Sequence, residues 1–312
     1  MRHTPLLLFV WGCFGGGPNT MASGPDSGGV GCGPAVVAGT WNMLHGLTDE
    51  DPEADEFDRV GERLAGAAAV IRDEGLTVLL VQEVVLGEVE GYPDVGAELL
   101  SAVGPGWTLL HGDILGHDLV GADGDGWGQA TLTCLPVNAT GNHMLSDTNG
   151  TPRSVSWVQV QAGDVGLDGA AATLDIYNAH TSGNGAAELG DLLAFVDQTA
   201  TGDVALLGGD LNQRDTDGAL SVIRDAGFVD LGERGGLTCL TQGDLGCTGD
   251  TMPLAEAGNR ATVRIDYLWQ RGGSPGTDAR PLLGEPLVLD EGGALWPSDH
   301  IGVRAEVNLT PP

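Results

Sequence analysis

The sequence has few basic residues. Only 13 Lys and Arg stand against 44 Asp and Glu among 312 residues, which gives a formal charge of −31. A surface of this sign repels polyanions at a distance, so loose binding of nucleic acid through a basic face is disfavoured. A phosphate substrate is not excluded, because a bound divalent cation can invert the local field. The acidity is also typical of proteins adapted to a salty habitat, whatever they bind.

Aromatic residues and two common binding motifs are also scarce. Aromatics make up 5% of the chain, which leaves few for the exposed aromatic surface that an enzyme acting on membrane lipids would use. The sequence lacks a Cys-x-x-Cys pair with a nearby His, which disfavours zinc, and it lacks a Gly-rich phosphate-binding loop. Hydrophobic residues, at 41%, predict a buried core despite 52 glycines.

The N-terminus has the features of an export signal. Arg2 precedes a short apolar run, residues 6–11, that is too short to span a membrane. Gly12-Cys13 resembles the end of a bacterial lipoprotein signal, in which Cys13 would be lipidated, although Trp11 fits that motif poorly. We expect residues 1–33 to be a signal and linker. The protein would then be periplasmic, an outer-surface lipoprotein attached to the membrane through Cys13, or secreted.

Export to an oxidising compartment would permit disulfides. The cysteines that follow the signal are Cys32, Cys134, Cys239 and Cys247. Four cysteines allow three pairings. We favour Cys239 with Cys247, because this pair closes a turn-rich loop.

Residues 34–312 show no repeat and no internal linker, so we expect one domain. Residues 35–42 and 77–83 predict buried strands, and residues 57–71 between them repeat apolar side chains at helical spacing. In α/β sheets, ligands bind at the strand ends that such a unit brings together. Further strands are expected at 107–110, 129–136, 154–161, 173–178, from 204, at 263–269 and at 302–307, and further helices at 97–103, 188–200 and 217–226.

Acids, amides and histidines accompany these strands. The segment 205–212 delivers Asp210 and Asn212 on one side of an extended backbone, after two glycines that let a ligand approach. The other candidates are Asn42, Glu83 and His180 at strand ends, Asp266 within a strand, and Asp299 and His300 before the last strand. Each is ordinary alone, but one sheet edge can gather all of them into a water-activating or metal-binding site.

These residues stand in motifs that occur in the same order in the endonuclease/exonuclease/phosphatase superfamily. The motifs are Trp41-Asn42-Met43, Gln82-Glu83-Val84, Asn178-Ala179-His180, Gly209-Asp210-Leu211-Asn212, Arg264-Ile265-Asp266-Tyr267 and Ser298-Asp299-His300. The chain resembles that superfamily from about Thr40 to Val307. The resemblance implies an α/β fold, a four-layer sandwich of two packed mixed β-sheets flanked by helices, and metal-dependent hydrolysis of phosphate esters.

The resemblance also implies a metal site. Glu83, with Asn42 and Asp299 nearby, would hold Mg²⁺ or Mn²⁺. Carboxylate and carbonyl oxygens suit these hard cations.

The same resemblance assigns catalytic roles. Asp210 would orient or deprotonate the attacking water, and Asn212 would position that water or a phosphate oxygen. His180 and His300 would donate hydrogen bonds to the oxygens on which charge builds in the transition state. Asp266 would accept a hydrogen bond from His300 and fix its ring.

Two positions depart from the family pattern. Leu211 replaces the usual Phe, which is a tolerable apolar change. Thr133-Cys134-Leu135-Pro136 stands where the family commonly has Ser-Arg before a Pro. An arginine that contacts the substrate or supports the structure is therefore missing, and Cys134 can serve a disulfide instead.

Other motifs are weaker. Residues 272–276 match the nucleophile elbow of serine hydrolases, but Pro275 predicts a loop there. Gly141-Asn142-His143 is similar to one motif of the calcineurin-like metallophosphatases, whose preceding motifs are missing. Residues 123–126 and 215–218 lack the full ligand spacing of a Ca²⁺ loop.

Three functions remain open. The first is an exported phosphoesterase acting on small phosphorylated molecules or phospholipid headgroups, and the second is a secreted nuclease of the deoxyribonuclease type. The third, a non-catalytic surface protein that keeps the fold, is disfavoured because every expected acid, amide and His is present. A nuclease is expected to have basic residues near the site, and Arg214, Arg260 and Arg264 are the few candidates, so the sequence does not choose between the first two functions. No protein partner is inferred.

Overall fold

The computed structural model describes residues 32, 35–44, 59–87, 93–112, 126–146, 152–162, 172–249, 261–288 and 293–310. The predicted signal with Cys13, the basic candidate Arg260 and most of the 123–126 loop lie outside these ranges. Within them, no helix has the length and apolar character needed to cross a bilayer.

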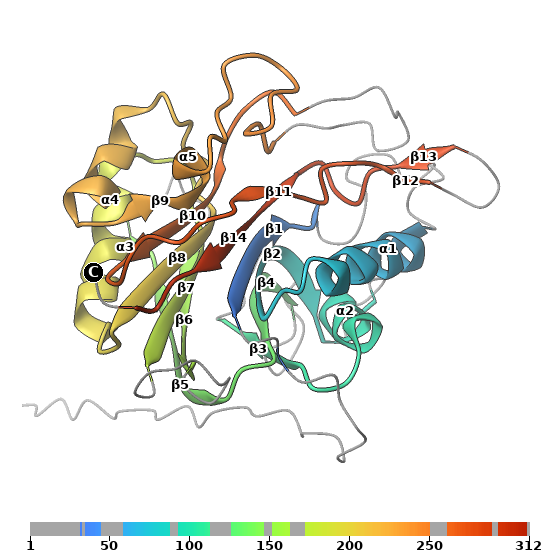
Figure 1. Ribbon diagram of the computed structural model, residues 1–312, viewed down its shortest axis with the longest axis horizontal. Coiled ribbons are helices and arrows are strands. Elements are labelled where there is room, and N and C mark those ends of the chain that lie inside the picture. Colours follow the sequence, from blue (N-terminus) through green and yellow to red (C-terminus); the bar gives the residue numbers. More distant parts are fainter. Residues whose placement is uncertain are drawn as a thin grey trace, which may run out of the picture.

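In the described part of the chain, two six-stranded mixed sheets form the centre of the fold (Figure 1). The first has the order β11-β14-β1-β2-β4-β3 and the second the order β5-β6-β7-β8-β10-β9. The strands of the first sheet are β1 (Val36–Asn42), β2 (Val78–Leu86), β3 (Thr108–His111), β4 (Gly126–Thr133), β11 (Arg280–Leu282) and β14 (Gly302–Val307). Those of the second are β5 (Val137–Met144), β6 (Ser154–Gln161), β7 (Thr173–His180), β8 (Val204–Asp210), β9 (Val229–Asp230) and β10 (Asp266–Arg271). A small ribbon joins β12 (Leu287–Val288) to β13 (Ala294–Leu295).

Helices cover the outer face of each sheet (Figure 1). The first sheet carries α1 (Val60–Asp73) and α2 (Val95–Val103), and the second carries α3 (Ala186–Thr199) and α4 (Ser221–Asp225). A single 3₁₀ turn (Gly218–Leu220) precedes α4, and the short α5 (Leu231–Arg234) follows β9. The layers thus run helix, sheet, sheet, helix, which confirms the four-layer sandwich expected from the sequence.

The central strands are apolar on both faces because both faces are covered. In β2, Leu79 packs beneath α1 and α2 while Leu80 packs against the second sheet. In β8, Leu207 packs beneath α3 while Leu206 lies between the sheets. Strands buried on both faces are continuous apolar runs, which is why they are clear in the sequence. Most of their polar side chains are placed at or near the strand ends.

Two strand–helix–strand units bring those ends together. β1 and β2 are parallel and joined through α1, and β7 and β8 are parallel and joined through α3. β10 runs antiparallel to β8, and β14 antiparallel to β1. The carboxyl ends of the four parallel strands therefore share an edge with the beginnings of β10 and β14.

Several element boundaries differ from those predicted. The strand expected at 129–136 spans 126–133, because residues 126–128 also pair with β2. The helix expected at 217–226 is shorter, a 3₁₀ turn followed by α4. The strand expected at 263–269 begins only at Asp266. β5 was not predicted, since its side chains alternate between exposed and half-buried and give no apolar face.

Two disulfides are present among the described residues. Cys239 is bonded to Cys247, the pairing favoured from the sequence, and Cys32 is bonded to Cys134. The second bond ties the beginning of the described chain to the end of β4.

Cys134 lies far from the predicted site residues. Its backbone N–H donates to the carbonyl of Thr77, directly before β2. Glu83 lies about 20 Å further along β2 at the usual rise of a strand. The arginine missing from the family pattern at this position is therefore not a loss from the site.

Gly209 permits the close approach of β7 and β8 beside the site. It has φ 138°, and a Cβ atom there would collide with the carbonyl oxygen of Ala179 on β7. We expect Gly209→Ala to lower the free energy of unfolding by about 3 kcal/mol, since both the backbone conformation and the strand spacing must change. Chemical denaturation measures this change.

Gly190 is a matched control for that variant. It lies exposed within α3, and a Cβ atom there meets nothing within 4 Å. Gly190→Ala should raise the free energy of unfolding by about 0.5–1 kcal/mol, because it removes backbone freedom from the unfolded chain. Equal stability of the two variants would contradict this account.

Candidate active site

The residues predicted from the sequence gather at one edge of the sandwich. They are Asn42, His180 and Asp210 at the ends of β1, β7 and β8, Glu83 within β2, Asn212 just after β8, Asp266 at the start of β10, and Asp299 and His300 before β14. In the second sheet, Asp210 stands in register with His180 on one side and with Asp266 on the other. Pairing between distant strands thus brings together residues that the sequence separates.

A β-bulge directs Glu83 toward this edge. The pairing of β2 with β4 is regular up to Val81 and resumes at Val84, with the register shifted between them. Glu83 lies in the shifted stretch and has φ 56°. A bulge inserts one residue and turns its side chain away from the regular alternation. This explains how Glu83 reaches the site from within a strand.

Asn42 joins the two sheets at the site. Its amide nitrogen Nδ2 donates to Glu83 Oε1 at 3.0 Å and to Asp210 Oδ2 at 3.1 Å. Its oxygen Oδ1 accepts from the backbone N–H of Leu44 at 3.0 Å. Asn42, predicted to lie near the cation, thus links a carboxylate of the first sheet to one of the second.

Two histidines flank the Asp210 carboxylate. His180 Nε2 lies 3.6 Å from Asp210 Oδ2 and 3.8 Å from Glu83 Oε1. His300 Nε2 lies 3.9 Å from Asp210 Oδ2 and 3.9 Å from Asp299 Oδ1. These separations exceed hydrogen-bond length. The two imidazoles and three carboxylates therefore face one common region, where a small charged group could contact several of them.

Asp266 holds His300 as predicted. His300 Nδ1 donates to Asp266 Oδ2 at 2.9 Å, and the Asp266 side chain is fully buried. Burial lowers the pKa of His300, but the carboxylates of Asp266, Asp210 and Asp299 outweigh it and raise that pKa well above its ordinary value. This shift favours the imidazolium form of His300, in which each ring nitrogen carries an N–H.

The pKa values of two carboxyl groups in the site are raised. Burial, followed by repulsion from Asp266, raises the pKa of Asp210 to about 7, even though His300 and Asn42 favour its ionised form. Burial, followed by repulsion from Glu83, raises the pKa of Asp299. Nearby positive charge would favour ionisation of both groups.

The acidic groups fit a hard divalent cation. Among the described residues, Glu83, His180 and Asp210 offer ligand atoms within 4.8 Å of one another, and so do Asp210, Asp266 and His300. In the second set, one ring nitrogen of His300 is already bonded to Asp266, and the raised pKa of His300 disfavours the neutral imidazole that binds a metal. The first set is the better site, and Asp299 lies close enough to Glu83 for the two to interact. Such carboxylate oxygens suit Mg²⁺ or Mn²⁺.

Asn212 stands beside Asp210. Its backbone N–H donates to Asp210 Oδ1 at 2.8 Å, and its side-chain Nδ2 donates to the carbonyl of Thr181 at 2.9 Å. It has φ 48°, a conformation that Asn adopts more readily than most residues. Asn212 thus holds the loop after His180 against the loop after β8, and its side chain is exposed at the site.

Sequence reasoning missed Arg153. It lies half-buried directly before β6, whose first residue, Ser154, is in register with His180. Burial lowers the pKa of Arg153. The carboxylates that act against this fall in pKa are those of Glu83, Asp210 and Glu188. A cation thus lies beside the acidic cluster, and only the strand pairing reveals it.

The basic candidates named from the sequence contribute less. Arg264 is buried and bonded to Asp230 at 2.7 Å, with its guanidinium 4.7 Å from the centre of the Tyr267 ring. It supports the fold instead of facing a substrate. Arg214 is exposed on the loop after β8, where its backbone N–H donates to Asp217.

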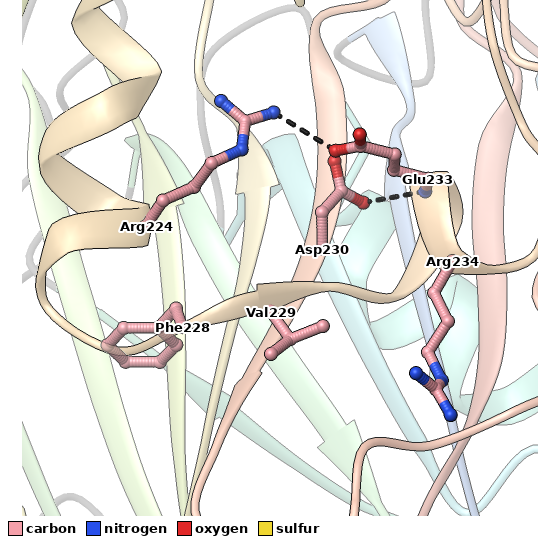
Figure 2. A pocket seen from close by; sticks show the side chains of 6 residues that line it. All are labelled: Arg224, Phe228, Val229, Asp230, Glu233 and Arg234. Carbon is pink, nitrogen blue, oxygen red and sulfur yellow. Dashed lines mark hydrogen bonds and ion pairs between the residues drawn. The ribbon is translucent and has the colours of Figure 1, made fainter.

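A hollow lies at β9 (Figure 2). Its volume is about 460 Å³, and it is lined by Arg224, Phe228, Val229, Asp230, Glu233 and Arg234. Arg224 pairs with Glu233 at 3.1 Å, and Asp230 accepts from the backbone N–H of Glu233 at 3.0 Å (Figure 2). None of the predicted site residues lines the hollow, so we do not assign the chemistry to it.

The raised pKa of Asp210 predicts a pH-dependent stability in metal-free protein. The folded chain keeps a proton that the unfolded chain releases, so the wild type loses stability as pH rises from about 3.8 to about 7. The loss is about 4 kcal/mol at most, since each pKa unit corresponds to about 1.4 kcal/mol. Asp210→Asn avoids this loss because its side chain does not ionise. In urea unfolding with a chelator, the free energy of unfolding of Asp210→Asn relative to the wild type should therefore be higher at pH 8 than at pH 4.5. The same difference at both pH values would refute the raised pKa.

Solved structures share this fold. A mannosyl-6-phosphatase from Bacteroides thetaiotaomicron matches with a TM-score of 0.67 and 17% identity, covering 88% of this chain and 99% of that one. An endonuclease/exonuclease/phosphatase protein from Beutenbergia cavernae matches at 0.57 and 21%, covering 88% and 72%. TDP2 from Caenorhabditis elegans matches at 0.58 and 19%, covering 88% and 74%. At these identities the similarity shows the fold alone.

No protein with a curated description matches the sequence. The model of the Endonuclease/Exonuclease/phosphatase family matches residues 39–300, which span every predicted site residue from Asn42 to His300. Members of this family are metal-dependent phosphoesterases and nucleases. With its motifs gathered at one sheet edge around acidic groups that fit a divalent cation, the chain belongs to the endonuclease/exonuclease/phosphatase family and is a metal-dependent phosphoesterase.

Proposed function

We propose that the protein is an exported hydrolase that uses Mg²⁺ or Mn²⁺ to cleave phosphate esters of small phosphorylated molecules or phospholipid headgroups. The observation that carries this proposal is the Asp210 carboxylate, linked to Glu83 through Asn42 and flanked by His180 and His300. Export is supported by the N-terminal signal pattern and by the two disulfides, which suit an oxidising compartment.

Glu83 and Asp299, with Asp210 beside them, would hold the cation. When bound, it would supply positive charge that polarises the phosphoryl group and favours ionisation of nearby water. Asp210 would accept the proton of the attacking water, since its carboxylate faces the region that His180 and His300 share.

The histidines stabilise the negative charge that builds on phosphoryl oxygens. His300 presents the N–H of Nε2 toward the region it shares with Asp210, while Nδ1 is held by Asp266. His180 faces the same region from β7. Donors fixed before the reaction stabilise a developing anion without reorganising, which is where most of the rate gain arises.

Charge favours small substrates over nucleic acid. The chain has a formal charge of −31, and Arg264, one of the few basic candidates, is occupied by Asp230. Arg153 offers one cation beside the cluster, enough for a single phosphate group but not for a nucleic-acid backbone. The structural similarity to a mannosyl-6-phosphatase fits this choice, while the match to the Endonuclease/Exonuclease/phosphatase family is the reason to include a nucleic-acid substrate in the assay.

His300→Ala should nearly abolish turnover, because it removes a charged donor and leaves Asp266 without its partner. Positioned groups of this kind contribute about 10²–10⁴-fold each. The assay compares bis-p-nitrophenyl phosphate, p-nitrophenyl phosphate, plasmid DNA and sphingomyelin, with and without Mg²⁺ and Mn²⁺. The substrate cleaved fastest identifies the subclass.

His143→Ala is the matched control, since His143 also pairs with an aspartate, Asp191 at 3.1 Å, but lies at the end of β5 beside α3. It should keep the wild-type rate. Retention of more than about a tenth of the rate by His300→Ala would contradict the assigned role.

Arg153→Met should lower kcat/KM by about tenfold, chiefly through KM, if the guanidinium binds the substrate phosphate, since charged hydrogen bonds contribute about 1.5–3 kcal/mol. Steady-state kinetics on the best of the four substrates measure the change. Arg234→Met, at the hollow near β9, is the control and should leave KM unaltered. An unchanged KM in Arg153→Met would remove Arg153 from the site.

A further inference from the structure

A layer of uncharged polar side chains is buried between the two sheets, directly behind the site. Its members are Thr40, Gln82, Gln129, Ser154 and Asn178, each 0% exposed. Polar groups at such a depth cost free energy unless hydrogen-bonded, and these side chains bond mainly to one another and to nearby backbone groups.

Asn178 reaches from the second sheet to the root of the bulge in the first. Its Nδ2 donates to the carbonyl of Val81 on β2 at 3.1 Å and to that of Ala130 on β4 at 2.9 Å. Val81 and Ala130 are register partners, the last regular pair before the shift that carries Glu83. One side chain therefore ties together the two strands where the regular pairing ends.

The orientation of the Asn178 carboxamide is itself fixed. Gln82 Nε2 donates to Asn178 Oδ1 at 2.8 Å and to Thr40 Oγ1 at 3.2 Å. Because the Asn178 oxygen is engaged by Gln82, both N–H groups of Asn178 point to the two carbonyls. The hydrogen-bond partners of the Asn178 carboxamide therefore fit one orientation of this group.

The other side of the bulge is held in the same manner. Gln129 lies opposite the shifted stretch, between Ala130 and Gly128. Its Nε2 donates to the carbonyl of Ser154 at 2.7 Å, and its oxygen accepts from Ser154 Oγ at 2.8 Å. The bulge of the first sheet is thus fastened to β6 as well as to β7 of the second.

Such fastening is needed because Glu83 has an uncommon backbone conformation. A non-glycine residue at φ 56° costs about 1–3 kcal/mol and persists only where its surroundings hold it. Without those contacts, β2 and β4 could return to regular pairing, which would turn Glu83 away from the site.

We propose that Asn178 is a positioning residue for the cation: by holding the bulge from the opposite sheet, it sets the direction of the Glu83 carboxylate. The proposal rests on the proposed function, since it concerns the cation that Glu83 would bind. Asn178 itself touches no reacting group.

The test measures Mn²⁺ binding to metal-free protein by isothermal titration calorimetry, independently of turnover. Asn178→Leu removes both donors at similar size, and we expect Mn²⁺ to bind at least about 10-fold more weakly, as when the outer partners of metal ligands are removed. The free energy of unfolding is measured in parallel, because a merely structural role would lower that quantity alone.

Asp175→Asn is the matched control. Asp175 lies on β7 with the opposite orientation, fully buried, and accepts from the backbone N–H groups of Thr201 and Gly202. The substitution weakens a buried set of bonds remote from the bulge, so stability should fall while Mn²⁺ affinity stays at the wild-type value.

The outcomes separate the two proposals. If wild-type protein binds no Mn²⁺, the proposed function fails, and the role of Asn178 fails with it. If the wild type binds Mn²⁺ and Asn178→Leu binds it equally well, only the role of Asn178 is overturned.

Should Asn178→Leu not fold, a second variant tests the same role. Gln82→Met keeps Asn178 but removes the hydrogen bond that fixes the orientation of its carboxamide. We expect it to weaken Mn²⁺ binding about 3-fold or more, and wild-type affinity would overturn the inference.

Discussion

The catalytic end of the molecule depends on one amide group, that of Asn42, which holds a carboxylate from each sheet within hydrogen-bonding distance. Glu83 and Asp210 would repel each other because little water is present to screen their charges, and burying charge is costly unless it is compensated. The Asn42 donor and the histidines on either side of Asp210 supply that compensation. The site therefore exists only while the two sheets keep their relative position, and the buried amides behind it maintain that position.

The same crowding of carboxylates raises the pKa values of two neighbouring groups, Asp210 and His300. Burial and the Asp266 charge raise the pKa of Asp210 to about 7, so in the metal-free protein this carboxyl group binds and releases a proton near neutral pH. The carboxylates also raise the pKa of His300, which favours its charged form. A base and a cationic donor thus arise side by side from one electrostatic environment, as is typical of sites that combine acid and base chemistry.

Local patterns predicted much of the fold and most of the site residues. The strands containing Leu80 and Leu206 are recognisable because burial on both faces leaves an uninterrupted apolar run, and the polar residues that follow such runs mark the edge where ligands bind. What escaped prediction depends on pairing across the chain. Arg153 gains its place only from the register of β6 with β7, and the bulge at Glu83 exists only relative to β4. β5 escaped because an edge strand needs no apolar face.

The disulfide between Cys32 and Cys134 helps to place both ends of the described chain on one side of the molecule. It fastens the beginning of the described chain near the start of β2, and Val307, close to the other terminus, is in register with Val36. Both ends of the described chain thus leave from the side remote from Asp210. A support attached directly at either end of the described chain would therefore hold the acidic cluster on the side that faces away from it.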